Sequence, residues 1–210
     1  MNSEAILKFW IGTAALDSEA AKNRSKRWYT SSADDDEAMS VQFGATLKQA
    51  ERGALADWQK TPQGRLALVI LLDQMSRNIY RGTAQAYAND AHALDLASQM
   101  VDAGEHLQLT NIEQVFLFHP FEHAESLAAQ QRSVQLFTEL LSRATADWHQ
   151  QLQRFLDFAI IHHNIIATYG RFPHRNSVLE RQSTAAESDY LIKGPTFGQS
   201  HTTSAHNHRQ

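Results

Sequence analysis

The chain has 210 residues, of which 42% are hydrophobic, so one domain of this length can bury a sizeable core. Its formal net charge of -4 argues against a general nucleic-acid binder, since such proteins are usually basic. The absence of cysteine excludes disulfides, thiolate nucleophiles and cysteine-based zinc sites. The longest apolar run, residues 66–72, is much shorter than the roughly 20 residues of a membrane span, so we expect a soluble, cytoplasmic protein.

Apolar residues recur at three- and four-residue spacing and strand-like alternation is nearly absent, which predicts an all-helical chain. The first helix is expected at residues 3–15, followed by an irregular polar connector at 16–33. The carboxylates from Asp34 to Glu37 favour the start of a second helix, which should end near Gly53.

The third helix, residues 62–81, is the most apolar segment of the chain. Its stretch "LALVILL" is hydrophobic on every face, so this helix should lie at the centre of the fold. A fourth helix is expected from Thr83 to Gly104. Thr110 and Glu113 have the spacing of a capping box, which predicts the start of a fifth helix.

Proline then interrupts the helical pattern. Pro120 should kink or split the fifth helix, because proline lacks the N–H group and crowds the preceding turn. Further helices are expected at residues 126–144 and 146–169, and Gly170 suits the left-handed residue that closes the second of them. Residues 171–182 read as irregular.

The chain should end in a short helix and a polar tail. Thr184 and Glu187 form a second capping-box pattern, which predicts the last helix. Residues 194–210 are polar and rich in histidine, and we expect them to be disordered. Residues 1–193 are therefore predicted to form one all-α domain of seven or eight antiparallel helices of tetratricopeptide-like type.

Four segments contain charged or ionisable residues at positions where the apolar pattern predicts the hydrophobic core. The first is the end of the third helix. Asp73, Arg77 and Arg81 are four residues apart and share one face, with Asn78 beside them. An ion-pair network without any ligand explains this pattern. The alternative is that the arginines face an anion, because a guanidinium group binds carboxylate or phosphate through two hydrogen bonds.

The second segment is "FLFHPFEHAE", in which His119 and His123 are four residues apart and Glu122 lies between them. Such a pair on an unbroken helix could hold a metal ion, but Pro120 disturbs the geometry and the zinc-peptidase pattern H-E-x-x-H is not completed. The alternative is that both histidines are ordinary hydrogen-bonded residues.

The third segment, "FAIIHHNIIATYG", is apolar on nearly every face, so at least one of His162 and His163 should be buried. A buried imidazole needs hydrogen-bond partners, and a satisfied core histidine is one interpretation. The other is a general acid or base that faces a pocket.

The fourth segment, "GRFPHRN", follows the 146–169 helix directly. Cations favour a helix C-terminus, which explains one arginine but not the whole group of Arg171, His174 and Arg175, with Asn176 beside it. Pro173 stiffens the segment, and a stiff loop with placed cations suits anion binding.

The motifs "LDQ..RN.YRGT", "PFEH.E" and "GRFPHRN", in this order, resemble a bacterial family known as domain of unknown function number nine hundred and twenty-four. The resemblance runs from about Phe9 to Leu191 and implies an all-helical, tetratricopeptide-like fold, but no reaction. Met75 and Ser76 stand where the family pattern has Phe and Pro. Glu180 stands where it has glycine, which puts the turn before Arg181 in question, because Glu tolerates a positive φ poorly.

Three functions remain open. In the first, the four segments line a cleft that binds a small anionic molecule, a phosphate or a carboxylate, without a cofactor or metal. Its expected ligand-binding residues are Asp73, Arg77, Asn78, Arg81, Glu122, His123, Arg171, His174, Arg175 and Asn176. If catalysis occurs there, the candidates for acid–base chemistry are His162, His163, His123 and Glu122.

The second function is a tetratricopeptide-like adaptor whose arginines clamp the terminal carboxylate of a peptide. The third is a metal enzyme that uses His119 or His123 with His162 or His163 and Asp73. No interaction with nucleic acid or membranes is expected in any of the three, and the sequence gives no oligomeric state.

Overall fold

The apolar third helix of the sequence is the central element of the fold. The computed structural model describes residues 1–30, 32–195 and 197. In it α4 (Pro62–Val69), the π-helical segment η3 (Ile70–Met75) and α5 (Ser76–Ile79) follow one another without a break. Every residue from 66 to 76 is buried, as the sequence predicts for this helix. We call α4, η3 and α5 together the central helix.

The central helix begins and bends for local reasons. The Thr61 hydroxyl accepts a hydrogen bond from the Gly64 N–H at 3.1 Å, and Pro62 occupies the first turn, where no N–H is needed. At η3 the Ser76 N–H donates to Leu71 O, five residues back. One extra residue in a turn rotates everything after it by about 100°, and such π segments are frequent at functional sites.

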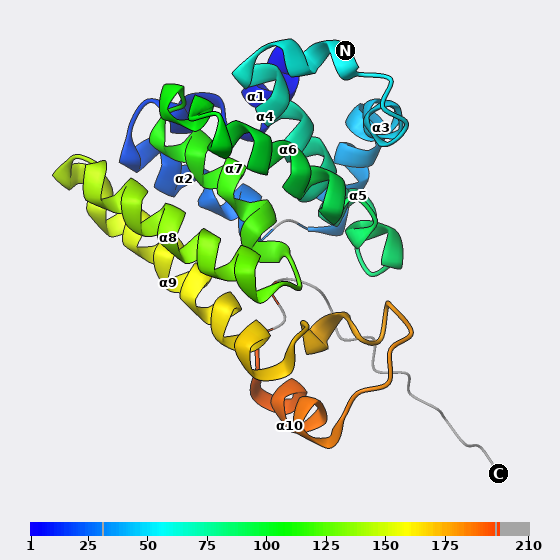
Figure 1. Cartoon of the computed structure of the whole chain (residues 1–210). Helices are drawn as coiled ribbons and strands as arrows, with labels where there is room; N and C mark the ends of the chain where they lie inside the picture. Colours follow the sequence, from blue (N-terminus) through cyan, green and yellow to red (C-terminus); the bar gives the residue numbers. More distant parts are fainter. Residues whose placement is uncertain (31, 196, 198–210) are drawn as a thin grey trace.

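Four helices pack around the central helix. They are α1 (Ser3–Trp10), α3 (Ala33–Glu51), α6 (Asp90–Asp102) and α7 (Asn111–His123). The pair α8 (Leu127–Arg143) and α9 (Ala146–Tyr169) lies side by side and packs against α7 (Figure 1). This arrangement confirms the all-α, single-domain prediction, and no strand occurs among the described residues.

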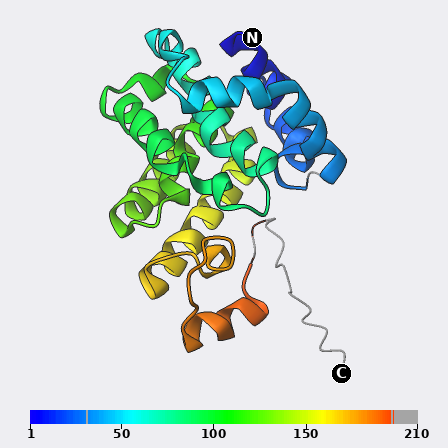
Figure 2. The ribbon, with the colours of Figure 1, turned by 90° about the vertical axis from the view of Figure 1, so that its right-hand side faces the viewer.

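The segment after α9 lies at one end of the molecule. Figures 1 and 2 both show it, in orange, below the other helices and ending in α10 (Ala185–Lys193). Gly170 closes α9 with φ +71°, as predicted, and both predicted capping boxes are present, at Thr110 and Thr184. Most of the predicted polar tail, residues 194–210, lies outside the described residues.

The predicted connector at 16–33 is wrong, because α2 (Ser18–Tyr29) occupies most of it. The first helix is accordingly shorter than predicted: α1 ends at Trp10, and Gly12, with φ +53°, opens a short 3-10 turn (Gly12–Ala15). The polar sequence of α2 hides its helical periodicity, since Trp28 provides most of its buried apolar surface. The Trp28 indole donates to Trp10 O at 2.8 Å.

Two further expectations need correction. The helix α7 runs through Pro120 without a break, because buried phenylalanines on both sides of the proline offset one missing backbone hydrogen bond. Thr83 does not start α6; its hydroxyl donates to Tyr80 O, and a 3-10 turn (Ala84–Tyr87) precedes the helix. With the central helix counted once, the described residues form nine α-helices, and α2 is the one that prediction missed.

The described part of the chain contains no helix with both the length and the apolar character that a bilayer crossing requires. The tetratricopeptide-like label stays a prediction.

The turn before Arg181 forms although glutamate occupies its left-handed position. Glu180 has φ +54°, and the Arg181 N–H donates to Asn176 O at 2.8 Å. A left-handed conformation costs a non-glycine residue about 1–2 kcal/mol. The turn is therefore kept by its surroundings, including the Arg181 ion pair with Glu125 at 2.6 Å.

Replacing Glu180 with glycine should stabilise the protein by about 1 kcal/mol, because glycine adopts this conformation without strain and the exposed Glu180 side chain is not packed. Chemical denaturation of E180G and wild type measures the difference. The matched variant E180A should show no such gain, since alanine keeps the strain; equal stabilisation by both changes would contradict the explanation.

Candidate functional site

A pocket of about 440 Å³ lies between α2, the central helix, α7 and α9. Six of the residues predicted to form a site line this pocket: Arg77, Asn78, Arg81, Glu122, His123 and His162. Five of these side chains come from three helices that are far apart in the sequence, and Arg81 comes from the turn directly after the central helix. Trp28, Tyr29, Phe155 and Phe158 give the rest of the wall a largely aromatic character.

Asp73 lies directly behind this wall and has no exposed surface. Its Oδ1 accepts hydrogen bonds from His123 Nδ1 at 2.7 Å and from an Arg77 guanidinium nitrogen at 3.2 Å. Its Oδ2 accepts from the Gln74 amide at 2.5 Å. Burial alone would raise the pKa of Asp73, but His123 and Arg77 lower it more strongly, so this carboxyl is ionised.

Arg77 is held by two acids and joins the pocket wall to the segment after α9. Its guanidinium group pairs with Asp73 and, at 2.9 Å, with Asp90 of α6. Asp90 also pairs with Arg175 at 3.3 Å, so one carboxylate bridges both arginines. Both guanidinium groups lie over the Tyr87 ring, at 5.1 Å and 4.7 Å from its centroid. The end of the central helix and the "GRFPHRN" segment therefore meet.

Arg81 and Asn78 are oriented from α3 rather than from their own helix. The Arg81 Nε donates to Asp36 Oδ2 at 2.5 Å, and the Asn78 amide donates to Asp36 Oδ1 at 2.7 Å. Arg81 lines the pocket, whereas its partner Asp36 does not.

Three histidines line the pocket, and each has its Nδ1 bound to an acceptor of the protein. His119 Nδ1 lies 2.8 Å from Val115 O, His162 Nδ1 lies 2.8 Å from Phe158 O, and His123 Nδ1 faces Asp73. Because carbonyl and carboxylate oxygens only accept, Nδ1 carries the proton in each ring. Each Nε2 then holds a lone pair, and none makes a hydrogen bond within the part of the chain that the structure describes.

Burial keeps these imidazoles neutral. It lowers the pKa of His119 to about 3, with a further contribution from His123, and it lowers the pKa of His162 well below the ordinary value. Burial also lowers the pKa of His123, although Asp73 opposes the shift. At neutral pH the pocket thus presents three uncharged rings that can accept a hydrogen bond or a proton.

Glu122 is the buried acid of the pocket wall. It is 4% exposed, and its Oε1 lies 3.1 Å from His162 Nδ1. Burial, together with the charge of Asp73, raises the pKa of Glu122 to about 8. Glu122 is therefore protonated at neutral pH, whereas Asp73 nearby is ionised. Opposite pKa shifts in neighbouring carboxyls are typical of sites in which one carboxyl acts as a general acid and the other stays ionised.

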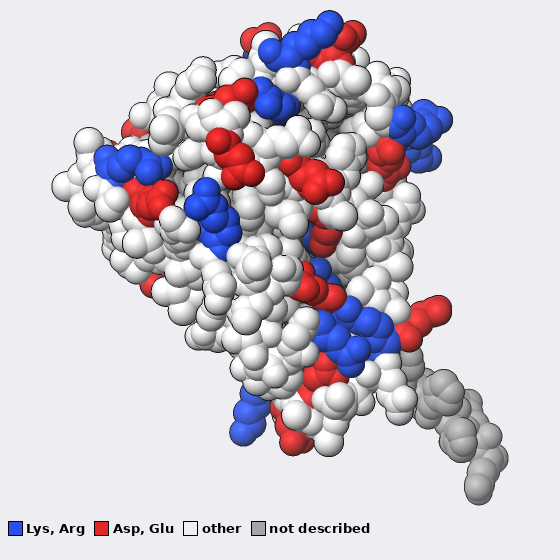
Figure 3. Space-filling model, viewed as in Figure 1, with Lys and Arg blue, Asp and Glu red and all other residues white. Residues whose placement is uncertain are grey.

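The other predicted residues do not line the pocket. Arg171 binds Glu187 through two hydrogen bonds of 2.6 Å and 2.8 Å, and Asn176 donates to the Ser183 hydroxyl at 3.0 Å. Arg175 is buried and donates to His123 O at 3.0 Å. It therefore contacts the backbone of a pocket residue without lining the pocket. Basic side chains in this part of the surface lie against acidic ones (Figure 3). His174 packs near Phe172, and His163 is only partly buried.

Sequence reasoning missed several wall residues. Trp28 and Tyr29 lay in the segment read as a connector, so no helix face could be assigned to them. Arg154 could have been found, because Arg154, Phe158 and His162 are four residues apart and therefore share one face of α9.

Within the described ranges, no group of three or more His, Asp or Glu side chains is placed to hold a metal ion. The rings of His119 and His123 are 5.6 Å apart, and those of His123 and His162 are 6.2 Å apart. The donors proposed for a metal enzyme therefore do not form a ligand set.

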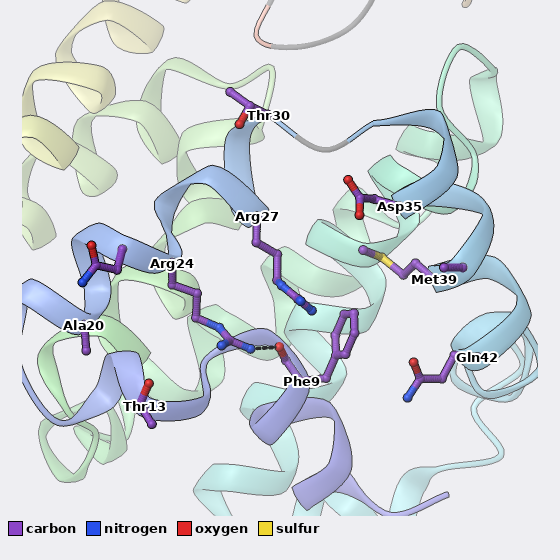
Figure 4. A pocket seen from close by; sticks show the side chains of 11 residues that line it. Phe9, Thr13, Ala20, Arg24, Arg27, Thr30, Asp35, Met39 and Gln42 are labelled. Atoms are coloured by element: carbon purple, nitrogen blue, oxygen red, sulfur yellow. Dashed lines mark hydrogen bonds between the residues drawn. The ribbon is translucent and has the colours of Figure 1, made fainter.

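A second hollow of about 710 Å³ lies between α1, α2 and α3 (Figure 4). Its arginines already have structural contacts: Arg24 donates to the carbonyl oxygens of Phe9 and Trp10 at the end of α1, and Arg27 lies 4.7 Å from the Phe9 ring centroid. This hollow is larger, but the smaller pocket has the buried ionisable side chains His119, Glu122 and His162 in its wall, and it is therefore the better candidate site.

The fold and the site together define an all-helical protein with a cluster of buried acids, arginines and imidazoles around one pocket. The sequence profile of the bacterial proteins of unknown function DUF924 matches residues 6–195, and the chain belongs to this family. A solved structure of a protein of unknown function from Agrobacterium tumefaciens is 33% identical, covers 91% of this chain and 97% of its own, and superposes with a TM-score of 0.76. No curated protein matches the chain significantly.

Replacing Glu122 with glutamine should remove the contribution of this carboxyl to the pH dependence of stability. The pKa of Glu122 is about 8 in the folded protein against 4.5 ordinarily, so the folded state holds this proton more tightly. The contribution of Glu122 to wild-type stability should therefore fall as pH rises between these two values, whereas the amide of E122Q does not titrate. The variant should gain on wild type by up to about 1.4 kcal/mol per pH unit.

Urea denaturation of both proteins across this pH range measures the difference in the free energy of unfolding. A difference that stays constant, or that shrinks as pH rises, would contradict a protonated Glu122.

Proposed function

We propose that the pocket binds a small molecule that carries a carboxylate or phosphate group beside an apolar or aromatic part. The single observation that carries this proposal is the convergence of Arg77, Arg81 and Arg154 on one pocket whose wall contains no ionised acid while Glu122 is protonated. Such a wall attracts an anion.

The positions of the acids support the same proposal. Asp73 and Asp90 hold Arg77, and Asp36 holds Arg81, but none of these carboxylates lines the pocket. The acids fix the arginine side chains from behind, which lowers the entropy cost of binding an anion at the front. A guanidinium group in a fixed orientation suits the two oxygens of a carboxylate or phosphate.

Arg154 differs from the other two arginines. It is exposed, and it makes no hydrogen bond or ion pair with the part of the chain that the structure describes. It can therefore turn towards a bound anion without breaking a contact, and its replacement should leave the fold intact.

The aromatic wall favours a ligand with an apolar part. Trp28, Tyr29, Phe155 and Phe158 offer ring faces and edges to the pocket. The volume of about 440 Å³ is typical of small-molecule sites, and a pocket of this size suits a small molecule better than an extended peptide.

Phenyl phosphate and phenylacetate combine an anion with an aromatic ring, and benzyl alcohol is a neutral molecule of similar shape. We expect the two anions at millimolar concentration to raise the melting temperature and benzyl alcohol to have little effect, because a ligand of the native state stabilises it. Equal shifts with all three compounds would contradict anion recognition.

Arg154→Gln should weaken phenylacetate binding about tenfold, which is the usual effect of losing a hydrogen bond between charged groups. The stability of the free protein should not change. Isothermal titration calorimetry measures the Kd, and Arg52→Gln at the end of α3 is the matched control, since Arg52 is also exposed and lies outside the pocket. The same loss in both variants would show that net charge, and not this pocket, determines binding.

A further inference from the structure

We propose that the pocket catalyses proton transfer on a carbonyl compound, with His123 as the general base and Glu122 as the general acid. The substrate would carry a C–H bond next to its carbonyl group and an anionic group that the arginines hold. This inference rests on the proposed anion-binding function and adds a reaction to it.

The geometry of Asp73 and His123 supports the base assignment. The buried Asp73 carboxylate accepts the Nδ1–H of His123 at 2.7 Å and fixes the orientation of the ring. In this tautomer the lone pair is on Nε2, and His123 lines the pocket. A carboxylate that orients an imidazole in this way also stabilises the imidazolium that forms when the base takes a proton. Asp73 is thus a positioning residue.

Groups from every neighbouring element face His123 and set its basicity. They are Asp73 and Arg77 of the central helix, Asp90 of α6, His119 of α7, His162 of α9, and Arg175, which donates to His123 O. Burial keeps the ring neutral before reaction, and the acids beside it favour the charged ring after proton transfer.

Glu122 directly precedes His123 in the chain, lines the same pocket and supplies the opposite function. It is buried, it is protonated at neutral pH, and its Oε1 is 3.1 Å from His162 Nδ1. A neutral carboxylic acid in an apolar wall can donate a hydrogen bond, or its proton, to a carbonyl oxygen.

The proton balance of the step closes without a further reactant. Nε2 of His123 takes the proton from carbon, and the electron pair of the broken C–H bond forms a C=C bond to the carbonyl carbon. The carbonyl oxygen takes the proton of Glu122, so the products are an enol, an imidazolium and a carboxylate. Return of a proton from the imidazolium to the same carbon, with the enol O–H proton going back to the Glu122 carboxylate, regenerates both residues and exchanges the hydrogen.

The same pocket gives little support to covalent catalysis. The chain has no cysteine, and the hydroxyl of the pocket-lining Ser25 donates to Lys22 O at 2.6 Å. Proton transfer uses only the groups that the pocket presents.

Phenylpyruvate is a suitable probe, because it combines a carboxylate, an aromatic ring and an acidic CH₂ next to a ketone. In D₂O the wild-type protein should replace the CH₂ hydrogens by deuterium about 100-fold faster than buffer, measured as loss of their proton NMR signal. His123→Gln should lower the protein-dependent rate about 100-fold, the usual contribution of a general base. His92→Gln, an exposed histidine of α6, should not change it.

Asp73→Asn tests the positioning residue. The exchange rate should fall about tenfold or more, and its pH profile should shift because the carboxylate no longer stabilises the imidazolium. An unchanged rate and pH profile would exclude this role. In wild type, long-range ¹H–¹⁵N NMR of the histidines should show the His123 proton on Nδ1 at neutral pH; a proton on Nε2 alone would overturn the base assignment even if the variants fail to fold.

The outcomes separate the two proposals. Binding of phenylacetate without deuterium incorporation above the buffer rate would overturn the catalytic inference and leave the anion pocket in place. Neither binding nor exchange would overturn both. Exchange that survives in H123Q would show that another group is the base.

Discussion

The site depends on one constraint: Asp73 is an ionised carboxylate with no exposed surface. Removing such a charge from water costs several kcal/mol, so each of its oxygens must be hydrogen bonded. Its partners are Arg77 and Gln74 of the central helix and His123 of α7. Because these partners lie on two helices, satisfying Asp73 also fixes how the central helix sits against α7 and where the imidazole of His123 stands.

From Asp73 the ion pairs continue towards the segment after α9. Arg77 pairs with Asp73 and Asp90, and Asp90 pairs with Arg175. The cations that gather in "GRFPHRN" therefore have partners: Arg175 joins the loop to the core, and Arg171 joins it to α10 through Glu187. The loop contacts residues of the pocket but does not line it. The arginines that line the pocket come from the end of the central helix, the turn after it, and α9. A rigid support of this kind reduces the ordering that binding requires.

Most of the fold was predictable because its signals are local. The capping boxes at Thr110 and Thr184 and the left-handed Gly170 depend only on nearby backbone groups, and each stands where the sequence predicts it. Helix α2 was not predictable, since its sequence is polar and its stability comes from packing of Trp28 against a distant helix. At Pro120 the rule that proline breaks a helix predicted a kink or split that does not occur. The buried neighbours of Pro120 in α7 outweigh the loss of one backbone hydrogen bond.

The sequence by itself determined the charged and imidazole residues of the site on the central helix, α7 and α9, but not the aromatic residues of α2, since periodicity and charge in an apolar segment are visible in the chain. Only the tertiary structure decided which of them meet. The π segment before Ser76 rotates the end of the central helix, and contacts with Asp36 and Asp90 orient its arginines. Distances between helices and the desolvation of a carboxyl arise from packing among distant residues, and these alone separate a protonated Glu122 from an ionised Asp73.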